Sequence, residues 1–157
     1  MAVPGRKVPA GAPAGLADAE LFAVDAYVRE FDSPVVEVDE EQRRVALRRT
    51  AFYPGGGGQP YDLGVLRWAD GVASVSRVKR EGSLIWHWLD GDQLPDPRTE
   101  VHGELDWERR HLTMRTHTAL QADGGTHVVS TAEIGSVAVT VTESRGKANK
   151  RIRIEVR

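Results

Sequence analysis

The sequence predicts an α+β protein: a small β-barrel over about residues 21–105, then a reduced α/β module of one helix and a C-terminal β-hairpin over residues 106–157. Short segments rich in Val, Ile and Trp, separated by turn residues, favour the barrel. One run of good helix formers follows, and the C-terminal residues alternate between apolar and polar positions. Residues 1–20 are rich in Pro, Ala and Gly and are expected to form a flexible tail.

Turn signals mark the strands of the barrel. A β-branched run, an acidic turn over residues 39–42 and a second alternating run over residues 45–47 predict a first hairpin. The Asp-Gly pairs at 70–71 and 90–91 and the Glu-Gly pair at 81–82 separate further short strands. We expect the last strand of the barrel to end near Asp106.

The C-terminal module begins with good helix formers over residues 107–120, with Asp106 in the N-cap position. Residues 137–141 and 152–156 alternate around a polar Gly-Lys-Ala-Asn-Lys turn, which predicts a hairpin. Its cations exceed its acids, Glu143 and Glu155, and suit phosphate contacts. A solvated charged face is the alternative, and composition alone favours it. The cations are Arg145, Lys147, Lys150, Arg151, Arg153 and Arg157.

The composition limits the classes of protein. A length of 157 residues allows one domain, or one domain with a small partner, and a net charge of -2 gives no bulk sign of a nucleic-acid partner. The absence of cysteine excludes disulfides and thiolate zinc sites, so any metal must be held by His, Asp, Glu or water. Without a long apolar run, we expect a cytoplasmic protein with no membrane partner.

Two motifs hold residues that suit chemistry. His117 and His127 flank Asp123, and an open His/Asp/His zinc site would supply hydroxide for hydrolysis. Spacing alone favours the simpler alternative, in which His117 packs in the helix and His127 bonds within a turn. The run "YPGGGGQP" lacks the Lys and the helix of a Walker loop. It suits a close backbone approach to a ligand, or only a turn.

Taken together, four motifs resemble those of the freestanding alanyl-tRNA editing proteins, which are related to the editing domain of alanyl-tRNA synthetase and to the second additional domain of threonyl-tRNA synthetase. The motifs are "RTAFYPGGGGQPYDLG" at 49–64, "DWERRHLTMRTHTAL" at 106–120, "DGGTHV" at 123–128 and "ESRGKANKRIRI" at 143–154. They occur in the family's order and, with the strands between them, cover nearly all of the chain from about residue 21.

The resemblance implies hydrolysis of the ester bond in mischarged alanine tRNA, to which serine or glycine has been wrongly attached. It also implies zinc at the active site. The family's first metal motif is His-x-x-x-His, where His117 matches the first histidine and Gln121 stands in place of the second. Asp123 and His127 match an Asp variant of the family's Cys-x-x-x-His motif. The long segment that separates these motifs in the family is missing between Leu120 and Gln121, as if it had been deleted.

Residue by residue, the resemblance implies that His117, Asp123 and His127 bind one zinc ion, whose bound water attacks the ester. It gives Thr50 the role of a pocket hydroxyl that favours serine over alanine. Gly57, Gly58 and Gln59 match a Gly-Gly-Gln element that lies near the tRNA acceptor end. The hairpin residues implied to hold tRNA phosphates are Lys147, Lys150, Arg151 and Arg153.

Two hypotheses follow: an editing hydrolase acting on mischarged alanine tRNA, or a catalytically impaired remnant that binds tRNA weakly at most. Convergence of His117, Asp123 and His127 separates them. We expect only partial convergence, because the chain must leave the helix and turn between His117 and Asp123. The loss of the intervening segment also predicts exposed apolar surface on the remaining elements.

Overall fold

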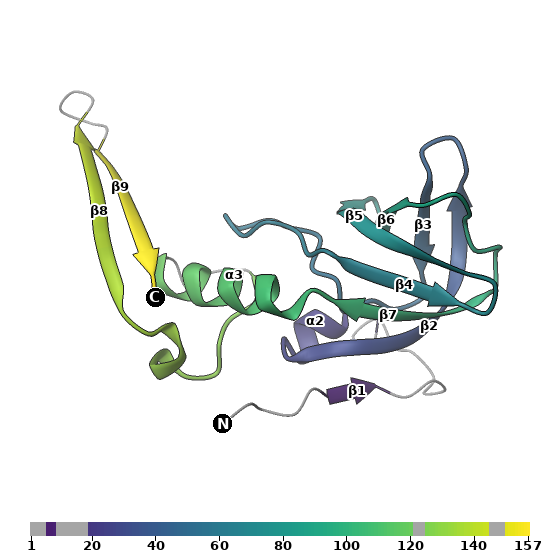
Figure 1. Ribbon diagram of the computed structural model, residues 1–157, viewed down its shortest axis with the longest axis horizontal. Coiled ribbons are helices and arrows are strands. Elements are labelled where there is room, and N and C mark those ends of the chain that lie inside the picture. Colours follow the sequence, from purple (N-terminus) through teal and green to yellow (C-terminus); the bar gives the residue numbers. More distant parts are fainter. Residues whose placement is uncertain (1–5, 9–18, 121–124, 145–149) are drawn as a thin grey trace.

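A closed six-stranded antiparallel barrel forms most of the structure, a computed structural model that describes residues 6–8, 19–120, 125–144 and 150–157 (Figure 1). The strands neighbour one another in the order β2, β3, β6, β5, β4 and β7, and β7 pairs again with β2. This confirms the predicted fold class. The barrel strands are β2 (Val28–Asp39), β3 (Arg44–Leu47), β4 (Gly64–Trp68), β5 (Gly71–Glu81), β6 (Leu84–Asp90) and β7 (Glu100–Leu105).

One long strand closes the barrel. The first part of β2 pairs with β7, from Glu30 opposite Glu104 to Pro34 opposite Glu100. Its second part pairs with β3, from Val35 opposite Leu47 to Asp39 opposite Arg44. Closure leaves no free edge among these six strands, which removes the unpaired backbone groups of an open sheet.

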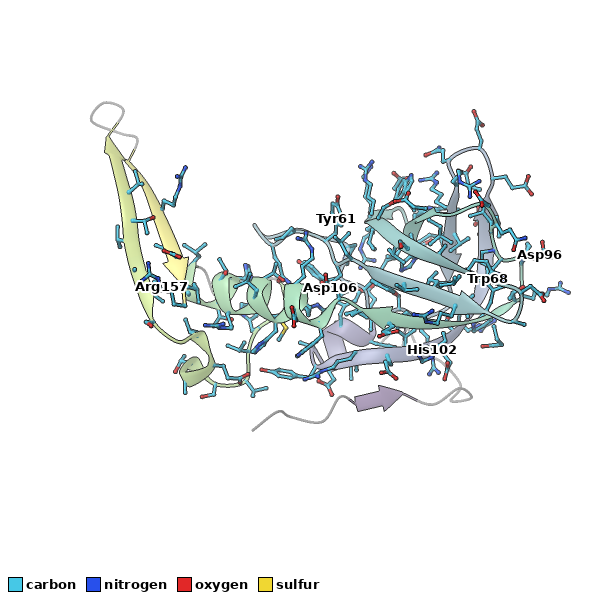
Figure 2. The ribbon with its side chains drawn as sticks, viewed as in Figure 1. Tyr61, Trp68, Asp96, His102, Asp106 and Arg157 are labelled. Atoms are coloured by element: carbon cyan, nitrogen blue, oxygen red, sulfur yellow. The ribbon has the colours of Figure 1, made fainter. Side chains whose placement is uncertain are left out.

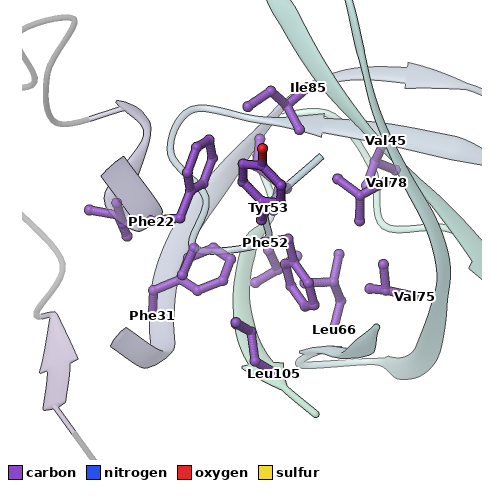
Figure 3. Close-up of a cluster of buried hydrophobic side chains, with 14 of the residues drawn as sticks. Phe22, Phe31, Val45, Phe52, Tyr53, Leu66, Val75, Val78, Ile85 and Leu105 are labelled. Carbon is purple, nitrogen blue, oxygen red and sulfur yellow. The ribbon is translucent and has the colours of Figure 1, made fainter. Parts of the chain in front are cut away.

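The barrel interior is filled by apolar side chains (Figure 3). Along much of β2 and β5, buried residues alternate with more exposed ones. Phe31 is fully buried and lies opposite Gly103, where a Cβ atom would meet the Phe31 ring at 2.5 Å. The ring therefore needs glycine on the facing strand. Other core side chains are Phe52, Leu66, Val75, Val78, Leu89 and Leu105.

Two short elements precede the barrel. The helix α2 (Leu21–Val24) buries Leu21 and Phe22 against it. The strand β1 (Arg6–Val8) pairs in parallel with β2. We expected a flexible tail over residues 1–20, but these three residues form a strand. Strand pairing uses backbone groups, so it can occur without an apolar pattern in the sequence.

The C-terminal module extends away from the barrel (Figure 1). The helix α3 (Trp107–Leu120) has the predicted bounds, and the Asp106 carboxylate caps it by accepting the Arg109 N–H at 3.1 Å. Figure 2 labels Asp106 where this helix begins and Arg157 at the end of the hairpin. The predicted hairpin is present as β8 (Val137–Ser144) and β9 (Lys150–Val156), preceded by the 3-10 helix η1 (Thr131–Ile134). Within the described ranges, no helix is long and apolar enough to cross a membrane.

Candidate functional site

A buried ion pair fixes the position of α3 on the barrel. Arg110 has no exposed surface, and its Nε atom donates to both carboxylate oxygens of Asp62 at 2.9 Å. The same guanidinium donates to the backbone carbonyls of Ala26 and Ala51 at 2.9 and 2.6 Å. Asp62 also accepts the Tyr53 N–H at 2.7 Å. Because Tyr53 and Asp62 flank the glycine run, this network holds the run beside α3.

His117 lies on the same side of α3 as Arg110. The buried residues of this helix are Arg110, Met114 and His117, whose spacing of four and three residues defines one helical face. His117 is only 5% exposed. The ion pair holds this face of α3 against the barrel. His117 therefore points toward the glycine run rather than toward solvent.

The second predicted histidine comes from the turn after the helix and meets the first. The ring centroids of His117 and His127 are 4.8 Å apart, with the ring planes 40° from parallel. The Nδ1 atom of His127 lies 3.2 Å from the hydroxyl of Thr118, the residue that follows His117. Two of the three predicted metal ligands thus converge.

A pair of hydrogen bonds ties the glycine run to the turn that carries His127. The Gln59 amide donates to the Thr126 hydroxyl at 2.6 Å and accepts the Thr126 N–H at 2.9 Å. Gln59 and Thr126 are 3% and 2% exposed. At Gly125 a Cβ atom would lie 2.6 Å from Nε2 of His117 and 3.1 Å from Oε1 of Gln59. The three segments therefore pack so closely that only glycine fits at this position.

A pocket of about 270 Å³ opens beside this contact. The glycine run forms one wall and α3 forms the other, with His117 among the lining residues. Most of the lining is apolar, including Pro60, Leu112 and Leu120. Its remaining lining residues are Gly57, Gly58, Gln59, Thr113 and Thr116. The pocket therefore joins the predicted glycine element to the first predicted metal ligand.

The segment after His127 is attached to the barrel by Tyr27. The Tyr27 hydroxyl donates to Glu133 at 2.7 Å and accepts the Val129 N–H at 3.1 Å. The hydrogen bond from Tyr27 lowers the pKa of Glu133, whereas burial is the main cause of the raised pKa of Tyr27. Glu133 also completes a capping box with Ser130 at the start of η1. No motif in the sequence marked Tyr27 or Glu133.

Thr50 is buried beside His87 of β6. Its hydroxyl is 2.9 Å from Nε2 of His87 and accepts the Phe52 N–H at 3.1 Å. Burial lowers the pKa of His87 to about 4, which keeps the imidazole neutral. The predicted role of Thr50 in a substrate pocket remains a prediction, as does a contact of the Gln59 amide with tRNA.

Part of the predicted site falls outside the described residues. Asp123, Gln121 and Lys147 do so, as do the side chains of Lys150 and Arg151. Arg153 is exposed on β9. The described ranges contain no group of three or more His, Asp or Glu residues arranged to hold a metal.

Two of the predicted ligands nevertheless suit zinc. Neutral imidazole nitrogens bind Zn²⁺ at about 2.0–2.1 Å, and a centroid separation of 4.8 Å allows one nitrogen from each ring to reach the same ion. The contact between Thr118 and Nδ1 of His127 resembles the outer-shell hydrogen bonds that orient ligating histidines. The donor set therefore fits as far as it is described.

The comparisons with known proteins divide the chain at α3. The family of class II (A) tRNA synthetases matches residues 17–109, and the second additional domain of threonyl and alanyl tRNA synthetases matches residues 113–153. These two matches define a protein related to the aminoacyl-tRNA synthetases. Within that class, the chain belongs to the alanyl-tRNA editing protein family, as its four motifs predicted.

Its relatives include both synthetases and editing proteins. The chain is 49% identical over 110 residues to the alanine–tRNA ligase of Pyrobaculum calidifontis, covering 70% of this chain and 11% of the ligase. It is 43% identical over 102 residues to the alanyl-tRNA editing protein AlaX-M of Saccharolobus solfataricus, covering 64% of this chain and 42% of that protein. The chain therefore matches about a tenth of the ligase and less than half of the editing protein.

Proposed function

We propose that this protein hydrolyses the ester of serine or glycine wrongly attached to alanine tRNA. The observation that carries the proposal is the short distance between the rings of His117 and His127, whose centroids lie 4.8 Å apart beside the glycine run. The two histidines come from two separate motifs. The relatives named as an alanine–tRNA ligase and an alanyl-tRNA editing protein support the substrate class. Such a substrate is consistent with the expected cytoplasmic location.

The proposal assigns zinc to His117 and His127, with Asp123 as the predicted third ligand. When bound there, zinc supplies an ionised water near neutral pH and polarises the ester carbonyl. The residues of the chain position the reacting groups: Gln59 and Thr126 hold the turn, and the pocket beside His117 receives the end of the substrate. In this proposal, elements that the barrel supports hold the reacting groups in position.

The basic hairpin gives the substrate a second contact in this proposal. Arg153 is exposed on β9, and it joins Lys147, Lys150 and Arg151 as a predicted phosphate contact. Phosphate contacts position a nucleic acid without reading its bases. The hairpin would therefore hold the acceptor arm, while the pocket and the histidine pair act on the ester.

Deacylation of serine-charged alanine tRNA tests the activity, with correctly charged alanine tRNA as the matched substrate. We expect turnover of the serine ester that is lost after chelation and restored by zinc. His117→Ala should abolish it, whereas Thr99→Val, a change on the loop before β7, should leave it unchanged. Turnover that survives both chelation and His117→Ala would refute the metal mechanism.

A second function, tRNA binding without turnover, is favoured by the exposed apolar side chains of α3. Leu112 and Leu120 are 49% and 61% exposed, as expected if a covering segment were missing from the catalytic module. In that case the protein binds charged and uncharged alanine tRNA equally, takes up no zinc and leaves the serine ester intact. Zinc analysis of the purified protein together with the deacylation assay distinguishes the two functions.

A further inference from the structure

Thr118 differs in its contacts from the other threonines of α3. The hydroxyls of Thr113 and Thr116 donate to helix carbonyls, those of Arg110 and Leu112, at 2.8 and 2.9 Å. This is the usual local bond of threonine within a helix. Thr118 instead places its Oγ1 atom 3.2 Å from Nδ1 of His127, across the turn.

A backbone group also uses the Thr118 oxygen. The Val128 N–H donates to Oγ1 of Thr118 at 3.4 Å. One oxygen thus contacts both the ring of His127 and the amide of the next residue, Val128, which is 8% exposed. Two contacts to adjacent residues restrict the ring orientation more than a single bond would, because the backbone and the side chain are held together.

We propose that Thr118 is a positioning residue that sets the tautomer and orientation of His127. In the arrangement we propose, Oγ1 accepts the Nδ1–H of the imidazole, which puts the proton on Nδ1 and the lone pair on Nε2; the opposite arrangement, with the hydroxyl donating to Nδ1, would put the proton on Nε2. In a neutral imidazole, the nitrogen that carries no proton binds metal or accepts a proton from water. Ligating histidines in proteins are oriented by such a bond from the other ring nitrogen.

This inference rests on the proposed function for what Nε2 binds, but the tautomer itself does not depend on that function. His117 and Thr118 are consecutive in α3, so one turn of helix supplies the first ring and orients the second. The Gln59 and Thr126 clamp holds the turn from its other side. His127 is therefore fixed through both its backbone and its ring.

Long-range nitrogen–proton NMR of histidine in the zinc-free protein tests the inference directly. We expect the wild-type His127 to show a protonated Nδ1 and an unprotonated Nε2. Thr118→Val, which keeps the shape of the side chain and removes the oxygen, should shift the ring toward the Nε2–H form. Thr118→Ser restores the oxygen and should restore the wild-type pattern. Thr99→Val serves as the control for a threonine away from the site.

Zinc affinity gives an independent measure, because the loss of an outer-shell partner typically weakens metal binding about 10–100-fold. We expect that loss for Thr118→Val and near wild-type affinity for Thr118→Ser. A wild-type His127 with its proton on Nε2 overturns the inference, whether or not the variants fold. An unchanged tautomer in a folded Thr118→Val protein does so too. If the wild type shows the expected tautomer and no deacylation, the proposed function fails while the inference stands.

Discussion

Arg110 of α3 and Asp62 of the loop before β4 form an ion pair with almost no exposed surface, although 48 positions separate them in the chain. Asp62 accepts from the guanidinium and from the Tyr53 N–H, while Arg110 also donates to two barrel carbonyls. Both charges are thus hydrogen-bonded, which is the condition under which a buried pair is tolerated. The pair joins the barrel to the helix that carries His117, so fold stability and site geometry depend on the same contact.

Arg110→Met should lower the free energy of unfolding by about 3–5 kcal/mol, because it leaves the Asp62 carboxylate buried without its cation. Chemical denaturation measures this change. Arg67→Met provides the matched control, since the Arg67–Glu104 pair is 3.7 Å long and about half exposed on both sides. That pair should contribute less than about 1 kcal/mol. Equal losses in the two variants would contradict the structural role given to Arg110.

Stability should fall between about pH 6.5 and pH 4 because of His87. Its pKa is lowered from 6.5 to about 4, mainly by burial, so the unfolded chain takes up a proton in this window and the folded chain does not. The free energy of unfolding therefore keeps the full contribution of neutral His87 above pH 6.5. It decreases by about 3 kcal/mol in total as the pH falls through this window. Urea denaturation across this range measures the slope.

His87→Gln is the control for this pH dependence. The variant cannot titrate, although the amide keeps hydrogen-bonding capacity toward Thr50 and the Val45 carbonyl, which His87 contacts at 2.9 and 3.2 Å. Whatever its stability at pH 7, its denaturation midpoint should vary less between pH 6.5 and 4 than that of the wild type. An unchanged slope would assign the dependence to other groups.

The elements with a local signature could be predicted from the sequence. Residues 107–120 form the predicted helix because Asp106 and the helix formers after it act within a few residues of one another. The barrel strands could be predicted in the same way, since turn residues and alternation are local. The approach of His117 to His127 was predictable in part, because these two residues are only ten positions apart in the sequence.

The contacts that build the site could not be predicted, because they join distant segments. Gln59 contacts Thr126 across 67 positions, and Tyr27 contacts Glu133 across 106 positions. Neither contact has a periodic or local pattern in the sequence. Gln59 shows the consequence: its two hydrogen bonds to Thr126 had no signal in the sequence, while its predicted contact with tRNA stays a prediction.

Gly125→Ala should impair the site more than the fold. A Cβ atom there would lie 2.6 Å from Nε2 of His117, so the ring must move and the zinc affinity should fall by at least tenfold. Gly82→Ala is the control. Gly82 has a positive φ, as Gly125 does, but a Cβ atom at Gly82 would meet nothing within 4 Å. Isothermal titration with zinc compares the two. Wild-type affinity in Gly125→Ala would show that Nε2 of His117 does not bind the metal.

Gln59 and Thr126 should act as one unit in deacylation. Gln59→Leu and Thr126→Val each remove part of the clamp and leave a buried polar partner without its hydrogen bond. An unsatisfied buried group lowers the stability of the folded clamp by about 1–3 kcal/mol. The double variant should lose little more activity than either single variant, which corresponds to a coupling energy of about 0.5–3 kcal/mol between the two residues. The cycle is measured in kcat/KM for serine-charged alanine tRNA. Additive losses would instead mean that Gln59 contacts the substrate independently of Thr126.

Arg153→Gln should weaken tRNA binding in a manner that depends on salt. Arg153 is exposed on β9, opposite Val141, and a phosphate contact there would release a counterion on binding. Removing one such contact lowers the slope of log affinity against log salt concentration by about 1, without changing the preference among tRNA sequences. Arg67→Gln removes an exposed arginine from the barrel and should leave the slope unchanged. If the two variants give the same slope, the hairpin is a solvated charged surface and the tRNA is held elsewhere.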